Sequence, residues 1–272
     1  MRPLWKGAIS FGLVNIPIRL FAATESKGLK FRFLHNVCHT PIAYEKHCPT
    51  CGREVEQEEI VRGYEYEKGR FVVLKDEDFE QIPTKTTKSI DIVDFVSLFE
   101  IDPIFYNRTY YLEPADGGQK AYALLRQAMK EAGRVAVAKV VIRDKETVAA
   151  IRVKDECLLL ETMYWADEIR TPKQLDLPQQ VEVNEKEVTM ARTLIDSLAA
   201  AFEPEKYTDE YRQELLQIIA AKMEGEEVVG GESPSPGKVI DLMEALKESI
   251  RVAAETREQE KTTKTKKRRK TS

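Results

Sequence analysis

The chain has 272 residues and a net charge of −4, because 42 Lys and Arg stand against 46 Asp and Glu. This length suits one large domain or two smaller ones, and an apolar content of 42% is enough for a hydrophobic core, which excludes a globally disordered chain. Charged residues interrupt the apolar runs well before the roughly 20 residues of a membrane-spanning helix, and residues 1–7 lack the apolar stretch of a signal peptide. We therefore expect a cytoplasmic protein with no membrane partner.

Most of the chain from residue 9 to about residue 169 is predicted to form short β-strands. Runs of β-branched and aromatic residues are punctuated by turn residues, which is typical of a barrel or a sandwich. In the first 112 residues the predicted strands are 8–12, 14–21, 30–34, 60–66, 70–74, 89–96 and 109–112.

All three histidines and three of the four cysteines lie within residues 35–51. The sequence CPTCG at 48–52 is a turn that can place two thiolates on one cation. The pattern predicts a structural zinc site formed by His35, Cys38, Cys48 and Cys51, which leaves no open position for catalysis. Only nine residues separate the two pairs, fewer than in usual zinc motifs, so a redox pair or unliganded thiols are the alternatives.

One amphipathic helix interrupts the predicted strands. It opens at Gly117-Gly118 and ends at Gly133, and a β-hairpin of residues 134–143 and 147–153 follows. Basic side chains recur along this helix and hairpin, at Lys120, Arg126, Lys130, Arg134, Lys139 and Arg143. Such a series could follow a phosphate backbone without reading bases; the alternative is a solvated helix face and hairpin edge.

The apolar period changes from two to about 3.6 near residue 183, which predicts helices. One helix ends before Pro204, and a second runs from 209 to 223. Gly, Ser and Pro make residues 225–237 a flexible linker, and residues 238–260 contain a short amphipathic helix. We interpret this helix as a partner-binding segment, with docking on the parent core as the alternative.

Charge is distributed unevenly along the chain. Residues 1–40 carry +5 and residues 261–272 carry +7, whereas the segments between them are acidic. The terminal run has no apolar side chain and is expected to be a disordered arm for a polyanion, with a solubilising tail or an address signal as the alternative. Its candidate contacts are Lys264, Lys266, Lys267, Arg268, Arg269 and Lys270, and the N-terminal segment adds Arg19, Lys27, Lys30 and Arg32.

Catalytic motifs are scarce in the sequence. The glycines form no phosphate-binding loop, no Gly-x-Ser-x-Gly elbow is present, and the histidines all lie beside the cysteines, where they leave no free base for a Ser-His-Asp triad. Carboxylates are numerous, so a metal-dependent nuclease stays an alternative. We expect no enzymatic activity and no required cofactor apart from the structural zinc.

Several long strings of the sequence carry a family resemblance. They are LWKGAISFGLVNIPIRLF at 4–21, CPTCG at 48–52, EIVRGYEY at 59–66, IDPIFYN at 101–107, YYLEP at 110–114, KAYALL at 120–125, EIR at 168–170 and FEPEKYTDEYR at 202–212. Together they cover roughly residues 1–225 and resemble the prokaryotic Ku family, the DNA-end-binding proteins of non-homologous end joining.

The resemblance implies a mixed β/α fold whose core is a seven-stranded type of β-barrel. The barrel would occupy residues 1–190, with an inserted DNA-encircling bridge at about 106–155. A helical region at 191–224 would serve dimerisation and ligase recruitment, followed by the linker 225–237, the amphipathic segment 238–260 and the basic tail 261–272. Two copies would form a homodimeric ring, so that the basic residues named above become candidate DNA contacts.

A closed ring implies a mechanism based on topology. It must thread onto a free end of double-stranded DNA, and phosphate contacts carry no sequence preference. The resemblance further implies protection or bridging of ends, recruitment of an ATP-dependent DNA ligase for double-strand break repair, and a place at the nucleoid. The alternative is a zinc-ribbon scaffold that touches nucleic acid only through its basic tail.

Overall fold

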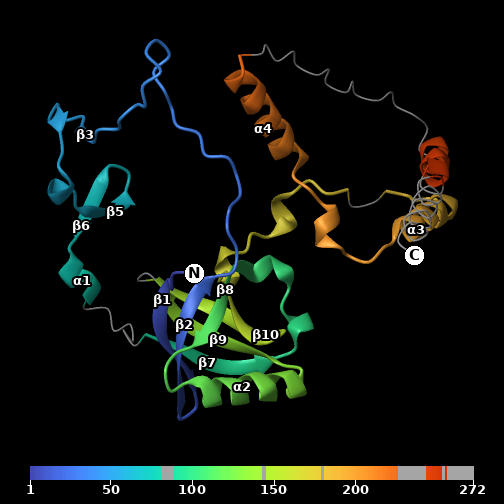
Figure 1. Ribbon diagram of the computed structural model, residues 1–272, viewed down its shortest axis with the longest axis horizontal. Coiled ribbons are helices and arrows are strands. Elements are labelled where there is room, and N and C mark those ends of the chain that lie inside the picture. Colours follow the sequence, from blue (N-terminus) through green and yellow to red (C-terminus); the bar gives the residue numbers. More distant parts are fainter. Residues whose placement is uncertain (81–87, 143–144, 179–180, 226–242, 253–254, 256–272) are drawn as a thin grey trace. The chain divides into compact units, whose positions relative to one another are not determined.

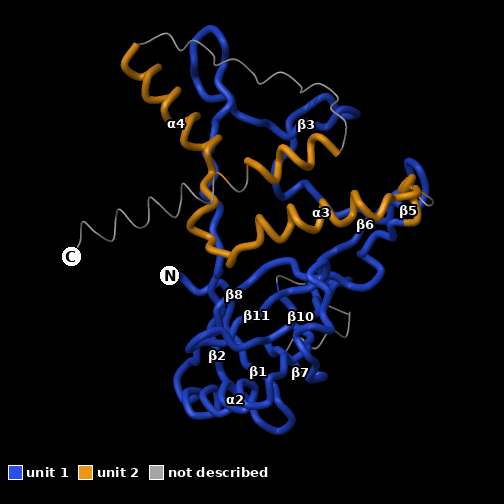
Figure 2. The backbone as a smooth tube through the Cα atoms, turned by 90° about the vertical axis from the view of Figure 1, so that its right-hand side faces the viewer, with its two compact units in different colours: residues 1–172 blue, residues 173–272 orange. Residues whose placement is uncertain are grey.

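A computed structural model describes residues 1–80, 88–142, 145–178, 181–225, 243–252 and 255 (Figure 1). The chain divides into two compact units, Met1–Pro172 and Lys173–Ser272 (Figure 2). Among the described residues, no helix is long and apolar enough to cross a membrane.

A closed barrel of seven strands forms the centre of the first unit (Figure 1). Its order is β1-β2-β8-β11-β10-β9-β7, and it closes where β1 pairs in parallel with β7, while every other pair is antiparallel. The prediction of a seven-stranded barrel is therefore confirmed. The strands are β1 (Trp5–Phe11), β2 (Val14–Ala22), β7 (Ser89–Val96), β8 (Tyr106–Pro114), β9 (Val135–Ile142), β10 (Lys145–Lys154) and β11 (Cys157–Met163).

Alternation along the strands fills the barrel interior. Ala136, Ala138 and Val140 of β9 are buried and join the core, whereas Lys139 between them is exposed. Two short 3-10 turns follow β7, η2 (Leu98–Glu100) and η3 (Pro103–Phe105). Ile101, which lies between them, and Phe105 of η3 pack with Val135, Ala150 and Met163 and so cover part of the outer face, including the end of β11.

Helix α2 (Gln119–Ala132) closes one end of the barrel (Figure 1). Tyr122, Leu125 and Met129 pack into the barrel core. The helix ends at Gly133 as predicted, because this residue takes the left-handed conformation (φ 61°) that glycine adopts without strain. The buried Tyr122 hydroxyl donates to the Leu112 carbonyl and accepts from the Leu158 amide, both at 2.7 Å, which ties α2 to β8 and β11.

Substitution Tyr122→Phe should lower the free energy of unfolding by about 2 kcal/mol, because it leaves a buried amide and a buried carbonyl without this partner. Chemical denaturation of the two proteins measures the difference. The matched control is Tyr44→Phe, since Tyr44 is 80% exposed and lies outside the barrel, so its change should leave stability unaltered. Equal stability of Tyr122→Phe and the wild type would contradict this role.

Residues 23–88 leave the barrel between β2 and β7, and we call them the insertion. Its strands pair only with each other, β3 with β4 and β5 with β6. None of its described residues is buried, so it has no core of its own. Its elements are β3 (His47–Cys48), β4 (Arg53–Glu54), η1 (Gln57–Glu59), β5 (Arg62–Glu67), β6 (Arg70–Leu74) and α1 (Asp76–Glu80).

Two sequence predictions fail in this part of the chain. The predicted strand at 30–34 does not form, because only Leu34 finds a partner, in an isolated bridge to Pro41. The predicted bridge at about 106–155 is wrong in position: β8, β9 and β10 from that range are barrel strands, and α2 closes the barrel. The segment that leaves the barrel is the insertion.

The second unit is helical. Helix α3 (Glu185–Leu198) begins at Asn184, whose side chain accepts from the Lys186 amide, and α4 (Glu210–Met223) begins at Asp209, whose side chain accepts from the Arg212 amide. A short 3-10 turn lies at the unit boundary, Pro172–Gln174, and another between the two helices, Pro204–Lys206, whereas the turn Ala166–Glu168 belongs to the first unit. Residues 243–252 are also helical, as predicted, whereas the linker beyond Gly225 and the tail 261–272 lie outside the described residues.

Candidate nucleic-acid interface

The predicted basic series does not lie along a single track. Lys120 and Lys130 are exposed on α2, at the end of the barrel, whereas Lys139 projects from the outer wall of β9. Lys139 lies opposite Asp91 of β7 in the strand register, and its ammonium is 6.0 Å from the centre of the Trp165 ring. Its charge is therefore partly balanced by an acidic neighbour.

Arg126 has a structural partner that the sequence pattern did not reveal. Its guanidinium donates to the Glu156 carbonyl at 2.8 Å and forms an ion pair with the Glu156 carboxylate. Glu156 lies in the turn between β10 and β11, so the contact fastens α2 to the barrel. We therefore assign Arg126 to this contact rather than to a phosphate.

Three basic residues gather around one hollow, which we call the basic hollow: Lys130, Arg134 and Arg152. The hollow has a volume of about 430 Å³ and lies where α2 ends and β9 begins, beside β10, with Asp155 in its wall. Lys130 and Arg134 belong to the predicted series. Their neighbour Arg152 does not, although alternation on β10 places it on the outer face of the barrel, next to buried Ile151.

Arg152 is held rigidly by Glu161 of β11. Two parallel bonds join them, Nε to Oε2 and Nη2 to Oε1, each 2.8 Å long. The bonds to the Glu161 carboxylate raise the pKa of Arg152, and burial raises the pKa of the adjacent Tyr106. Since one carboxylate already balances Arg152, the net positive charge of the hollow comes from Lys130 and Arg134.

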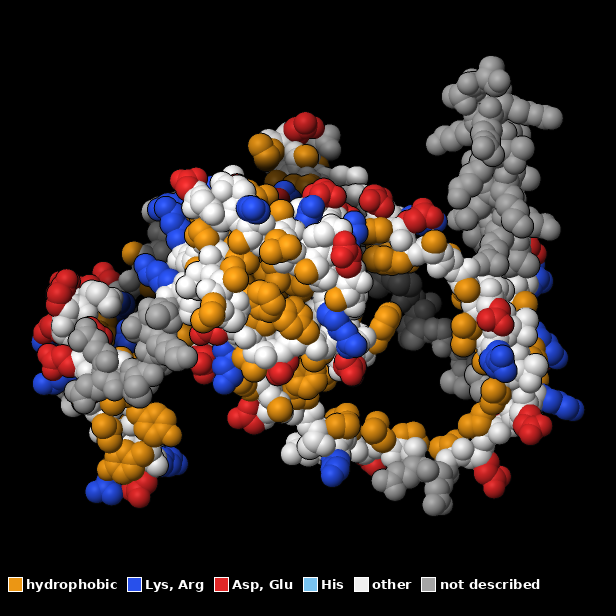
Figure 3. Space-filling view, turned by 90° about the horizontal axis from the view of Figure 1, so that it is seen from below, with side chains coloured by type: hydrophobic (Ala, Val, Ile, Leu, Met, Phe, Trp, Pro, Cys, Tyr) orange, Lys and Arg blue, Asp and Glu red, His pale blue; other side chains and the backbone are white. Residues whose placement is uncertain are grey.

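A hydrophobic groove of about 310 Å³ lies at the same end of the barrel, between α2, the β1–β2 hairpin and β7. Figure 3 faces this end and shows hydrophobic side chains gathered over it, with Lys and Arg side chains spaced around them. Leu124 of α2, which is 69% exposed, and Phe11 are among the residues that line it. Phosphates would meet cations only around the rim of this face.

The remaining predicted DNA contacts are dispersed. Arg19 on β2 pairs with Glu113 at 3.0 Å, and Lys27 pairs with Glu25. Lys30 and Arg32 are exposed in the insertion. Arg143 and the six predicted contacts in the tail lie outside the described residues: Lys264, Lys266, Lys267, Arg268, Arg269 and Lys270.

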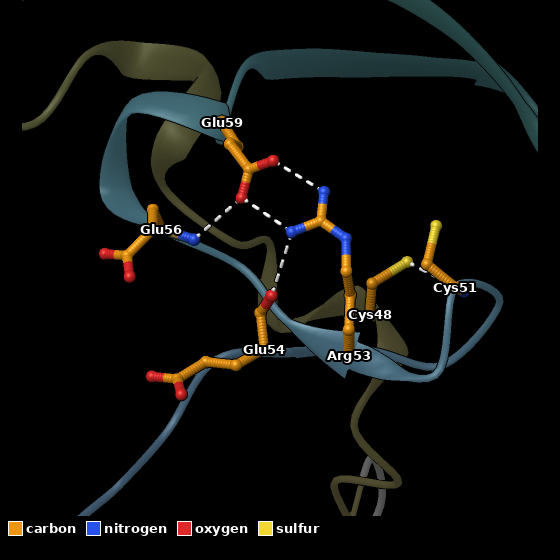
Figure 4. A network of polar contacts seen from close by, with 6 residues as sticks. All are labelled: Cys48, Cys51, Arg53, Glu54, Glu56 and Glu59. Carbon is orange, nitrogen blue, oxygen red and sulfur yellow. Dashed lines mark hydrogen bonds and ion pairs between the residues drawn. The ribbon is translucent and has the colours of Figure 1, made fainter.

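The four predicted zinc ligands form two separate pairs. His35 Nδ1 lies 3.1 Å from Cys38 Sγ, and the Cys51 amide donates to Cys48 Sγ at 3.5 Å (Figure 4). Hydrogen bonds from Thr40 and His35 lower the pKa of Cys38 to about 7, and the Cys51 amide lowers that of Cys48. Within the described part of the chain, no three potential ligands gather at one point, so the tetrahedral site is not assembled in this structure.

Comparison with known proteins decides the family. Residues 10–190 match the family model described as the Ku70/Ku80 beta-barrel domain, and this range contains all seven barrel strands but the start of β1. The chain belongs to the Ku family. The resemblance noted in the sequence is thereby confirmed, and the closed barrel is the domain that defines the match.

Bacterial relatives in the Ku family extend the match to the rest of the chain. A protein named "Non-homologous end joining protein Ku" from Symbiobacterium thermophilum is 53% identical over 93% of this chain, which spans 63% of that relative's length. A protein of the same name from Heliobacterium modesticaldum is 51% identical over 100% of this chain and 99% of its own length. The Bacillus subtilis protein of that name is 49% identical over 92% of this chain and 82% of its own.

Proposed function

We propose that this protein binds the ends of double-stranded DNA without sequence preference and acts in double-strand break repair by non-homologous end joining. A homodimeric ring threads onto the end, protects or bridges ends, and recruits an ATP-dependent DNA ligase. The observation that carries the proposal is the alignment of relatives named for non-homologous end joining with 92% to 100% of this chain. The chain performs no catalytic step in this scheme and works in the cytoplasm, at the nucleoid.

The insertion is the part of the chain that suits the ring. It leaves a closed barrel and returns to it, and none of its described residues is buried. The β5–β6 hairpin exposes Tyr64, Phe71 and Val73, although a two-stranded hairpin is marginal in water without a surface to cover it. In the dimer, this apolar surface is covered and the insertion encloses the duplex.

The helices of the second unit suit dimerisation and ligase recruitment, which we assign to residues 191–224. Neither α3 nor α4 has a buried residue, yet both carry large apolar side chains such as Ile195, Leu198 and Leu216, which are 65%, 61% and 46% exposed. Exposed apolar surface on this scale is typical of protein–protein contacts.

Basic side chains of the protein contact the phosphate groups of the DNA. The basic hollow at the end of α2 and Lys120 at the start of the same helix supply positive charge on the barrel domain, and the tail adds further cations. Residues 191–260 carry −8, so this part of the chain repels DNA, and binding concentrates where the cations lie.

The double substitution Lys130→Glu with Arg134→Glu should weaken binding to every duplex sequence alike. If both residues meet phosphates, the slope of log K against log salt becomes shallower by about 2, at ~0.9 per contact. Fluorescence anisotropy with two unrelated duplexes over a salt series measures this.

Two matched variants control for charge and for stability. Lys145→Glu removes an exposed cation of β10 that pairs with Glu168 at 3.3 Å and belongs to no predicted contact, and it should leave the slope unchanged. Arg126→Gln should lower stability and leave the slope unchanged. A loss restricted to one duplex sequence, or an unaltered slope in the double variant, would argue against phosphate contacts at the basic hollow.

A further inference from the structure

Helix α2 has an outer face that the barrel leaves uncovered. Three of its side chains pack into the barrel core, whereas Leu124, in the middle of the helix, is 69% exposed. Successive residues of a helix are about 100° apart, so residues three or four positions apart share a face. We define the outer stripe as the exposed residues within about 40° of Leu124 around the helix. They are Lys120, Leu124, Ala128 and Glu131.

The hydrophobic groove extends this surface to one side. Leu124 and Ala128 line the groove together with Phe11 of β1 and Phe95 of β7, and both phenylalanines are exposed (Figure 3). The two rings hold each other edge to face, with their centres 5.7 Å apart and their planes at 84°. Contiguous apolar surface of this kind marks a contact with another protein surface.

Opposite charges stand at the two ends of the outer stripe. Lys120 lies in the first turn of α2 and Glu131 in the last, about 16 Å apart along the helix axis, too far to pair with each other. Of the residues that the structure describes, none forms an ion pair with either of them. The Glu131 carboxylate accepts a hydrogen bond from the Gln127 amide group at 2.6 Å.

These two charges do not stabilise the helix that carries them. The positive end of the helix dipole is at the N-terminus, where an acidic side chain is favourable, and the negative end favours a basic one. Lys120 and Glu131 have the reverse order. Their placement is favourable only beside a surface that offers the opposite order of charges, and a second α2 helix that runs antiparallel is such a surface.

We propose that α2 packs against α2 of a second copy of this chain, antiparallel and about a two-fold axis. Lys120 of each copy then faces Glu131 of the other, and Leu124 of each faces Ala128 of the other. Both pairs share one midpoint on the helix, near residue 126, so one axis satisfies them together. The axis repeats every contact, which gives two ion pairs around an apolar centre, and the small side chain of Ala128 leaves room for Leu124.

The size of this surface sets the strength of the contact. Helix α2 has 14 residues and is about 21 Å long, so together with the groove it offers less than the roughly 800 Å² per partner of a standard interface. The contact is therefore weak in isolation and forms in proportion to protein concentration. It becomes strong where several copies are held together, because the second binding event is then intramolecular.

The groove and the insertion lie at opposite ends of the barrel. Strand β2 begins at Val14, which lines the groove, and ends at Ala22, where the insertion leaves. Strand β7 begins at Ser89, where the insertion returns, and reaches the groove at Phe95. Eight residue steps of a strand span about 27 Å, so a contact through α2 leaves the insertion free.

The position of the contact gives it a role in holding DNA ends together, and this step rests on the proposed function. If two insertions form a ring, each ring carries an α2 face on the side away from the insertion of each chain. Two rings that meet through α2 then hold two DNA ends in one assembly. Bridging of ends is thereby separated in the molecule from the binding of a single end.

Sedimentation velocity of the full-length protein without DNA, over a series of concentrations, tests the contact. The wild type should form dimers and, in a share that rises with concentration, assemblies of four chains or more. Leu124→Asp places a charge at the centre of the contact and should weaken the association of dimers by about 30-fold or more. Ala123→Asp is the matched control, because it adds the same charge to an exposed residue of α2 about 100° away, and it should assemble like the wild type.

A charge exchange tests the antiparallel arrangement. Lys120→Glu and Glu131→Lys each place like charges opposite one another, and each should weaken the assembly by about fivefold. The variant with both substitutions restores the two ion pairs and should assemble like the wild type. Cooperative thermal unfolding of every variant shows that the barrel is intact, as expected for changes at exposed positions.

Four results would overturn the proposal. The first is a wild type that stays dimeric up to about 1 mM, which would leave the groove to another segment of the chain or to another protein. The second is normal assembly of Leu124→Asp, and the third is a double charge variant that assembles no better than the single ones. The fourth is a monomeric Leu124→Asp, because α2 would then belong to the contact that forms the dimer.

Binding of a single DNA end separates this inference from the proposed function. Leu124→Asp should bind a short blunt duplex as tightly as the wild type, because the substitution leaves the insertion and the basic hollow unchanged. If the wild type assembles through α2 but binds no DNA end, the contact between copies stands and the proposed function fails.

Discussion

Replacement of residues 24–87 by a Gly-Ser linker should abolish the binding of DNA ends and leave the barrel folded. Residues 24–87 take part in none of the barrel pairings, and none of the described residues among them is buried. The barrel core, which lies on β1, β2, β7 to β11 and α2, is therefore untouched by the change. The replacement removes only the segment that we assign to the ring around DNA.

The barrel fixes the length of this linker. Ala23 and Lys88 stay, because the Ala23 amide donates to the Thr109 carbonyl at 3.1 Å and the Lys88 carbonyl accepts from the Ala8 amide at 2.9 Å. Strand β1 lies between β2 and β7, so the two attachment points are two strand spacings apart and offset by several residues along the strands, a span of roughly 20 Å. About ten Gly and Ser residues cover this distance.

Gel shift with a short blunt duplex measures the binding, and cooperative thermal unfolding shows that the barrel is intact. The control is the full-length protein with the same linker inserted after Gly225. It shows whether the linker itself affects the binding of DNA ends. Undiminished end binding by a folded shortened chain would show that the ring is built from another part of the molecule.

Local sequence signals predicted most of the barrel. The alternation in β1, β2 and β7, the helix ending at Gly133 and the hairpin of β9 and β10 all depend on neighbours in the sequence, and all are confirmed. The location of the bridge was wrong because a hairpin in a barrel and a hairpin in an arm have the same alternation. Only the long-range pairings, such as β1 with β7, show which segment is left outside.

Contacts between residues far apart in the sequence also decide the candidate interface, and local sequence patterns do not reveal them. Spacing together with the family resemblance placed Arg126 among the DNA contacts, but its partner Glu156 is 30 residues away in sequence and comes close only through the packing of α2. Arg152 was missed because its neighbours Lys130 and Arg134 come from other elements. The turns at Cys38 and Cys48 are local and form in the structure, whereas the predicted zinc site would need two separate turns to meet, and it stays a prediction.

Threading onto a free end is the central claim, and one comparison tests it most directly. The same duplex sequence is prepared as a linear molecule and as a relaxed, covalently closed circle, and binding to each is measured at one salt concentration, because affinity depends on salt. Cutting the circle once with a restriction enzyme then creates ends without changing the sequence.

We expect tight binding to the linear duplex and full recovery of binding when the circle is cut. Binding to the closed circle should be weaker by about 1,000-fold or more, the range that separates specific from non-specific complexes. Equal affinity for the linear and the closed duplex would contradict threading, since a protein that binds along the side of DNA has no need of an end.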